Sequence, residues 1–121
     1  MSVQENPNLS HIHLLLAREY LVLGQKEEAL ALFAKTLEVE DIETADDGLV
    51  LLQTLYFISL ICYELKDYDE CLWYAQRFIQ IDNSYREPYF LMARAYNEKR
   101  LYSLAEYSVL AGVNYGIRKN N

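Results

Sequence analysis

The sequence has few of the residues that interrupt secondary structure or form disulfides. Its 121 residues include 4 glycines, 2 prolines and 2 cysteines. So few turn-forming residues disfavour an all-β fold, which needs many turns. Apolar runs such as residues 49–52 are far too short to cross a membrane, and the N-terminus lacks the basic and apolar regions of a secretory signal. We therefore expect a soluble, cytoplasmic, α-helical protein.

Positive charge is also scarce, with 11 basic residues against 18 acidic ones and a net charge of −7. A net-acidic surface repels phosphate backbones, so nucleic acid is not an expected partner. The two cysteines, Cys62 and Cys71, fall at apolar helical positions. One disulfide between them is arithmetically possible, but we expect both thiols to be reduced and buried, which suits a cytosolic protein.

The sequence shows no recognisable metal-binding or catalytic motif. His11 and His13 are two apart, which points them to different sides of a helix, so a metal pair is not expected. The acidic segment 38–47 lacks the spacing of a calcium loop and is interpreted as a solvated loop. The sequence has neither a glycine-rich phosphate loop nor a nucleophile elbow. We expect no enzyme activity, no metal and no cofactor.

Apolar residues recur at helical spacing and predict six helices. Their expected ranges are about 6–23, 26–39, 48–65, 67–81, 84–99 and 103–116, with frayed termini. Gly24 is expected to end the first helix, because glycine accepts a positive φ. The spacings Asp67-x-x-Glu70 and Ser84-x-x-Glu87 predict capping boxes at the fourth and fifth helices.

The pattern of the helical pairs repeats along the chain. Cys71 lies 34 residues before Ala105, and Ala29 lies one such period plus eight residues before Cys71. On this frame the units begin at Ser10, Leu52 and Arg86. The eighth and twentieth positions are all small, which allows the two helices of a unit to cross closely: Ala17, Ser59 and Ala93, then Ala29, Cys71 and Ala105. The seventh positions are larger and are expected to fill the layer between units: Leu16, Ile58 and Met92.

This register resembles the tetratricopeptide repeat (TPR) family over about residues 10–115. The resemblance implies an all-α fold in which three antiparallel helix-turn-helix units, 10–43, 52–85 and 86–117, stack as a short right-handed solenoid of six helices. The whole chain, 1–121, would be one domain with an acidic insertion at 40–47. Lys66 and Arg100 depart from the family, since they stand where Gly24 matches its turn glycine, and Gly112 stands where a helix former is usual. Antiparallel helices without the repeat are the alternative.

A second resemblance concerns two strings, R-E-P-Y-F-L-M-A-R-A-Y at 86–96 and D-Y-D-E-C-L-W-Y-A at 67–75. They are similar to helical repeats that follow the catalytic domain in some bacterial family-2 glycosyltransferases. The chain would then be a stand-alone accessory region. It has no room for the nucleotide-sugar fold of the catalytic domain.

The TPR resemblance implies a non-catalytic scaffold or adaptor that binds a protein, peptide or helix in a concave groove. The groove positions come from the first helix of each unit: Leu14, Arg18 and Leu21, then Tyr56, Leu60 and Tyr63, then Phe90, Arg94 and Asn97. Exposed aromatics and arginines commonly dominate binding energy. The alternative interpretation makes Tyr56, Leu60 and Phe90 core residues. A glycosyltransferase accessory region and a small secretion-type chaperone are the alternative functions.

The sixth predicted helix carries more apolar residues than a terminal helix with one buried face needs. We expect an exposed interface there, formed by Leu104, Tyr107, Leu110, Val113 and Ile117. It would pair with a second copy as a homodimer, with a missing domain or with another protein.

Overall fold

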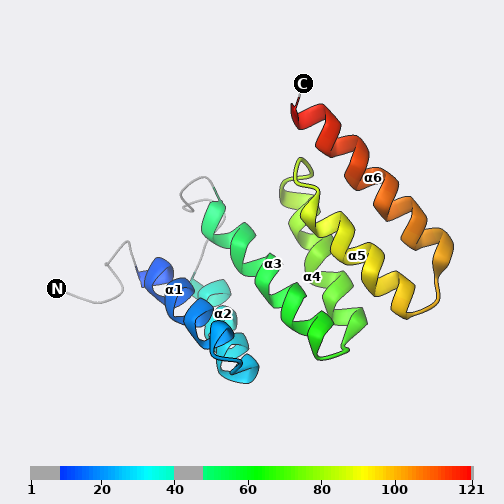
Figure 1. The fold of residues 1–121 in the computed structure, drawn as a ribbon. Coiled ribbons are helices and arrows are strands. Elements are labelled where there is room, and N and C mark those ends of the chain that lie inside the picture. Colours follow the sequence, from blue (N-terminus) through cyan, green and yellow to red (C-terminus); the bar gives the residue numbers. More distant parts are fainter. Residues whose placement is uncertain (1–8, 40–47, 121) are drawn as a thin grey trace. The chain divides into compact units, whose positions relative to one another are not determined.

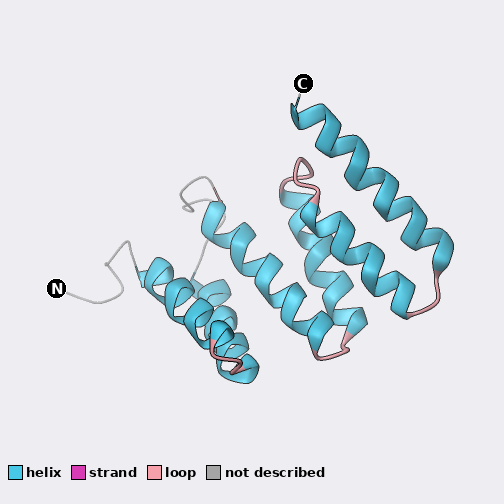
Figure 2. Ribbon diagram, viewed as in Figure 1, coloured by secondary structure: helices cyan, strands magenta, loops and turns pink. Residues whose placement is uncertain are grey.

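The structure is a computed structural model that describes the backbone of residues 9–39 and 48–120 and the side chains of residues 12–38 and 48–115. The described residues form helices and contain no strand (Figure 2), as expected for an all-α chain. The helices are α1 (Leu9–Val22), α2 (Lys26–Val39), α3 (Leu49–Glu64), α4 (Tyr68–Ile81), α5 (Glu87–Glu98) and α6 (Tyr102–Asn120) (Figure 1). Not one helix of this described part is both long and apolar enough to span a bilayer.

The helices divide between two compact units, residues 1–57 and 58–121. The first unit holds the antiparallel pair α1 and α2 together with the beginning of α3. Ala17 and Ala29 are fully buried there, as the close crossing of a helical pair requires. Phe33 of α2 is also fully buried and stacks on Phe57 of α3, with ring centroids 5.5 Å apart. This aromatic contact attaches α3 to the pair that precedes it.

The second unit holds the rest of α3 with α4, α5 and α6. Helix α4 packs on α5, and α5 lies beside α6 (Figure 1). Ile61, Cys71 and Ala95 are fully buried in this unit. The hydroxyl of Ser59 on α3 donates a hydrogen bond to the carbonyl oxygen of Cys71 on α4 at 2.7 Å. The eighth and twentieth positions of the middle repeat therefore meet.

Three turns, one inside each helical pair, have the same backbone geometry. Gly24, Lys66 and Arg100 all have positive φ, of 80°, 65° and 62°. Each donates its N–H to a carbonyl three residues earlier at 3.0 Å: Leu21, Tyr63 and Asn97. Each following residue donates to a carbonyl five residues earlier: Gln25 to Tyr20, Asp67 to Cys62 and Leu101 to Tyr96, at 2.8–2.9 Å. These paired bonds form Schellman motifs, and their spacing repeats the register expected from the sequence.

The positions expected to be small are at helix crossings, with one exception. Five of the six are buried, whereas Ala105 on α6 is only half-buried. Gly112 is a further close contact, because a Cβ added there would lie 2.7 Å from Cε1 of Phe90 and 3.0 Å from Cβ of Tyr89. The glycine that departs from the family pattern therefore allows α6 to approach α5.

Both predicted capping boxes are wrong. Asp67 is the N-cap of α4 but makes no side-chain cap hydrogen bond. The N-cap of α5 is Arg86, and Ser84 donates both its N–H and its hydroxyl to Oδ1 of Asp82, at 2.9 and 2.6 Å. This local Asx turn takes the serine away from the helix end, so α5 begins three residues later than expected.

The helix bounds otherwise agree closely with expectation. The range of α2 is as predicted, and the described part of α1 ends one residue early. Helix α6 extends to Asn120 rather than to Gly116. The expected cap at residues 46–47, the acidic insertion at 40–47 and the frayed N-terminus lie outside the described residues.

Candidate protein-binding surfaces

In the second unit, five of the predicted groove residues occupy faces of α3 and α5. Leu60 and Tyr63 are three apart on α3 and share one of its faces. Phe90, Arg94 and Asn97 follow one another along one face of α5. The side chains of Arg94 and Asn97 are exposed, whereas the other three are half-buried. Polar and aromatic groups are thus accessible on both helices.

In the first unit, one predicted groove residue is unavailable. Leu14 is only 4% exposed and belongs to the core of the unit. Arg18 is exposed, with its guanidinium carbon 5.7 Å from the ring centroid of Phe57, a cation–π distance. Leu21 and Tyr56 are half-buried. The accessible positions of this unit are therefore Arg18, Leu21 and Tyr56.

Helix α6 exposes a series of large apolar side chains, which we call the α6 surface. It consists of Tyr102, Leu104, Tyr107, Val109, Leu110 and Val113, all of them exposed. Tyr107 is 72% exposed and Leu110 is 56% exposed. Four of these residues are the ones expected at an interface, and the fifth, Ile117, lies outside the described side chains. Large apolar groups exposed together on one helix are typical of protein-binding surfaces.

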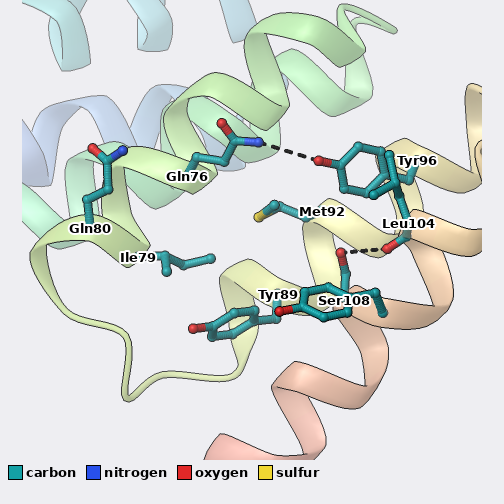
Figure 3. A pocket seen from close by; sticks show the side chains of 9 residues that line it. Gln76, Ile79, Gln80, Tyr89, Met92, Tyr96, Leu104 and Ser108 are labelled. Carbon is teal, nitrogen blue, oxygen red and sulfur yellow. Dashed lines mark hydrogen bonds between the residues drawn. The ribbon is translucent and has the colours of Figure 1, made fainter.

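A pocket of about 340 Å³ lies among α4, α5 and α6 (Figure 3). Its lining combines apolar, aromatic and amide side chains: Gln76, Ile79, Gln80, Tyr89, Met92, Tyr96, Leu104, Tyr107 and Ser108. Gln76 donates from Nε2 to the hydroxyl of Tyr96 at 3.4 Å, and Ser108 donates to the carbonyl of Leu104 at 2.9 Å. The pocket adjoins the α6 surface, because Leu104 and Tyr107 belong to both.

The pocket was not predicted from the sequence, although two of its residues were. Its amides, Gln76 and Gln80, are four apart on α4, a spacing that would have marked one helical face. Tyr89 closes one side and stacks on Tyr115 at 5.3 Å. Burial, with Tyr115 and Tyr107 nearby, raises the pKa of Tyr89 to about 12. The phenol therefore stays protonated at neutral pH.

The two cysteines are free and buried, as expected. Burial raises the pKa of the Cys62 thiol to about 11. Burial also raises the pKa of Cys71, against an opposing hydrogen bond from Ser59. Thiolate is the reactive form of cysteine, so neither side chain is prepared for nucleophilic attack at neutral pH. In the described part of the chain, no three metal-ligating side chains are grouped so that they could hold an ion.

A scan against protein-family models found no match, and a search of curated proteins found none either. Among solved structures, the chain is similar to the crystal structure of MamA, with a TM-score of 0.53 and 16% sequence identity. The match covers 98% of this chain and 84% of that one. Identity this low supports only the fold. Together with the repeated turns and crossings, it identifies the architecture as a TPR-like helical repeat.

Proposed function

We propose that the protein is a non-catalytic interaction module that binds another protein surface through the α6 surface. The observation that carries this proposal is the exposure of six large apolar side chains on one helix. Apolar surface left in water is unfavourable by roughly 25 cal/mol per Å². A partner that covers the α6 surface removes this cost, and the polar groups beside it, Gln76 and Gln80, would give orientation.

The first-helix residues are a second binding surface within the same proposal. Arg94 and Asn97 on α5 would bind a peptide or helix, with Phe90 beside them. Phe90 also packs against Gly112, so its ring is held in place before a partner binds. The α6 surface is preferred because it exposes six large apolar side chains, whereas Phe90, the apolar residue of the α5 surface, is half-buried.

No observation favours either of the two alternative functions. A glycosyltransferase accessory region and a secretion-type chaperone would each need a partner of their own class, and the neighbouring genes would reveal it. A reducing, cytoplasmic location is part of the proposal, since two unpaired buried thiols suit such a compartment.

Site-specific photo-crosslinking tests the proposal. A photoreactive amino acid replaces Tyr107 on the α6 surface, Arg94 on α5, or Glu27, an exposed control on α2. Each variant is irradiated in the native host cell. We expect a defined crosslinked polypeptide from position 107, lost when Leu110→Asp is added. A product from position 94 alone would move the site to α5. Absence of any product above the Glu27 control would contradict the proposal.

A further inference from the structure

The face that α6 leaves exposed overlaps the face that α2 and α4 cover, because Tyr102, Val109 and Val113 occupy positions that are buried or half-buried in both of those helices. On the repeat frame, Val109 occupies the position of Phe33 in α2 and Ala75 in α4. Phe33 is 0% exposed and Ala75 is 1% exposed, but Val109 is 42% exposed. Phe33 is covered because Phe57 of the following helix stacks on it. Helix α6 therefore presents a surface that, one and two repeats earlier, receives a first helix.

Helix α1 exposes the opposite half of that junction. Leu15 occupies the position of Phe57 in α3 and Leu91 in α5. Leu15 is 59% exposed, whereas Leu91 is 2% exposed and Phe57 is half-buried against Phe33. Two neighbouring positions show the same difference. Ile12 is exposed, while its counterparts Thr54 and Pro88 are buried. Leu16 is exposed, while its counterparts Ile58 and Met92 are buried.

We propose that α6 of one copy binds α1 of a second copy, so that the repeat continues from chain to chain. This inference rests on the proposed interaction function and names the partner. A second copy is the partner because its α1 carries the register-matched face that the internal junctions bury. The contacts between repeats inside the chain thus supply a template for the contact between chains.

The internal contacts specify which side chains would meet. The contact of Phe33 with Phe57 corresponds, at equivalent repeat positions, to a contact of Val109 with Leu15 of the second copy. In the second unit, Tyr68 donates to Glu98 at 3.2 Å and Gln76 donates to Tyr96 at 3.4 Å. The equivalent contacts between two copies would join Tyr102 to Val22 and Leu110 to Tyr20. Polar pairs inside the chain are thus replaced by mostly apolar pairs between chains, and Val22, at 79% exposed, would be covered.

Electrostatic repulsion opposes this contact and predicts how its strength depends on salt. Each copy carries a net charge of −7, and each face includes one exposed acidic residue, Glu19 on α1 and Glu106 on α6. Added salt screens repulsion between like-charged molecules. We expect the association to strengthen with salt, whereas an interface held by ion pairs would weaken.

The symmetry of the contact separates it from the homodimer expected through the C-terminal helix alone. An α6-to-α6 contact uses the same surface twice and stops at a dimer. An α6-to-α1 contact leaves one free α1 and one free α6, so further copies can add. Two blocked variants distinguish these arrangements. Leu110→Asp blocks the α6 surface and Leu15→Asp blocks α1, and both side chains are exposed, so neither substitution disturbs a core.

The test measures molar mass by light scattering for each full-length variant and for their equimolar mixture. Each variant alone is expected to be monomeric, with association weakened by about tenfold or more, because an unpaired carboxylate is costly to bury. The mixture is expected to form a dimer, since each variant keeps the surface that the other lacks. Leu65→Asp, at an exposed leucine in the turn after α3, is the matched control and should associate like the wild type.

Two results would overturn the inference. If Leu15→Asp alone dimerises as well as the wild type, α6 binds α6 instead. If the wild type stays monomeric to millimolar concentration, a second copy is not the partner. A crosslink from position 107 to a different polypeptide would then still support the interaction function, so the two failures can be told apart.

Discussion

The hydroxyl of Ser59 donates to the carbonyl oxygen of Cys71 at 2.7 Å, and its oxygen lies 3.4 Å from Sγ of the same cysteine. Both residues are fully buried. The bond joins the two positions at which the sequence places small residues in every unit. The crossing of α3 and α4 is therefore fixed by a short side chain and by a hydrogen bond.

Replacement of Ser59 by alanine should lower the free energy of unfolding by about 1 kcal/mol, the usual net value of a buried hydrogen bond. Ser108→Ala is the control, because the hydroxyl of the buried Ser108 bonds to Leu104 within its own helix at 2.9 Å. We expect the control to change stability by less than about 0.5 kcal/mol. Urea denaturation measures both, and equal effects would show that the interhelical bond has no special value.

Lys66→Gly and Arg100→Gly should each stabilise the protein by about 1 kcal/mol. Both residues have positive φ, a conformation that is unfavourable for residues with a Cβ and free of penalty for glycine. Both side chains are exposed, so little packing is lost. Lys35→Gly in the middle of α2 is the control and should destabilise by about 1 kcal/mol. Destabilisation by all three substitutions would contradict the assignment of the turns.

The repeat was predictable because it depends on residue size and spacing alone. Ala29, Cys71 and Ala105 mark the same register in the sequence and in the backbone hydrogen bonds, which they donate to Gln25, Asp67 and Leu101. The capping boxes failed for a different reason. The Asp67 N–H already belongs to the preceding turn, and Ser84 bonds to Asp82. A short motif cannot show which of two nearby partners a polar side chain will choose.

Exposure was harder to predict than register. The excess of apolar residues on α6 correctly indicated an exposed surface there. Leu16 on α1 was expected to fill the layer between units but is 45% exposed. An apolar stripe looks the same in the sequence whether or not a neighbour covers it. The pocket was missed because it needs three helices, and its residues are spread from Gln76 to Ser108.

Gly112→Ala should destabilise the protein by about 1 kcal/mol. Alanine gains about 1 kcal/mol of helix propensity, but the added Cβ would clash with Phe90 and Tyr89 and cost about 1–3 kcal/mol. In a Phe90→Ala background the nearest clash is removed, so the same substitution should be neutral or stabilising there. A double-mutant cycle measures this coupling. An identical effect in both backgrounds would mean that α6 does not depend on the glycine for its approach to α5.

Stability should fall as the pH rises above 9. The pKa of Cys62 is raised from 9.0 to about 11, so the folded state favours the protonated thiol. Its contribution is fully present below pH 9 and is lost as the pH rises through 11. At 1.36 kcal/mol per pKa unit, the loss by pH 11 is about 2 kcal/mol. Tyr89 acts in the same direction at higher pH.

The variant Cys62→Ala isolates this effect. Unfolding is measured at pH 8 and pH 11 under reducing conditions for both proteins. The decrease in stability between the two pH values should be smaller in the variant, whatever the substitution costs at pH 8. The same decrease in both proteins would assign the alkaline loss to other groups.

Methyl NMR of the wild-type chain from micromolar to millimolar concentration tests most directly whether the α6 surface binds α1 of another copy. We predict that the methyl resonances of Val109, Leu110 and Val113 shift together with those of Leu15 and Leu16, while those of Leu65 stay constant. Resonances of α6 and α1 that do not change over this range would contradict the claim, and shifts confined to α6 would contradict the role of α1.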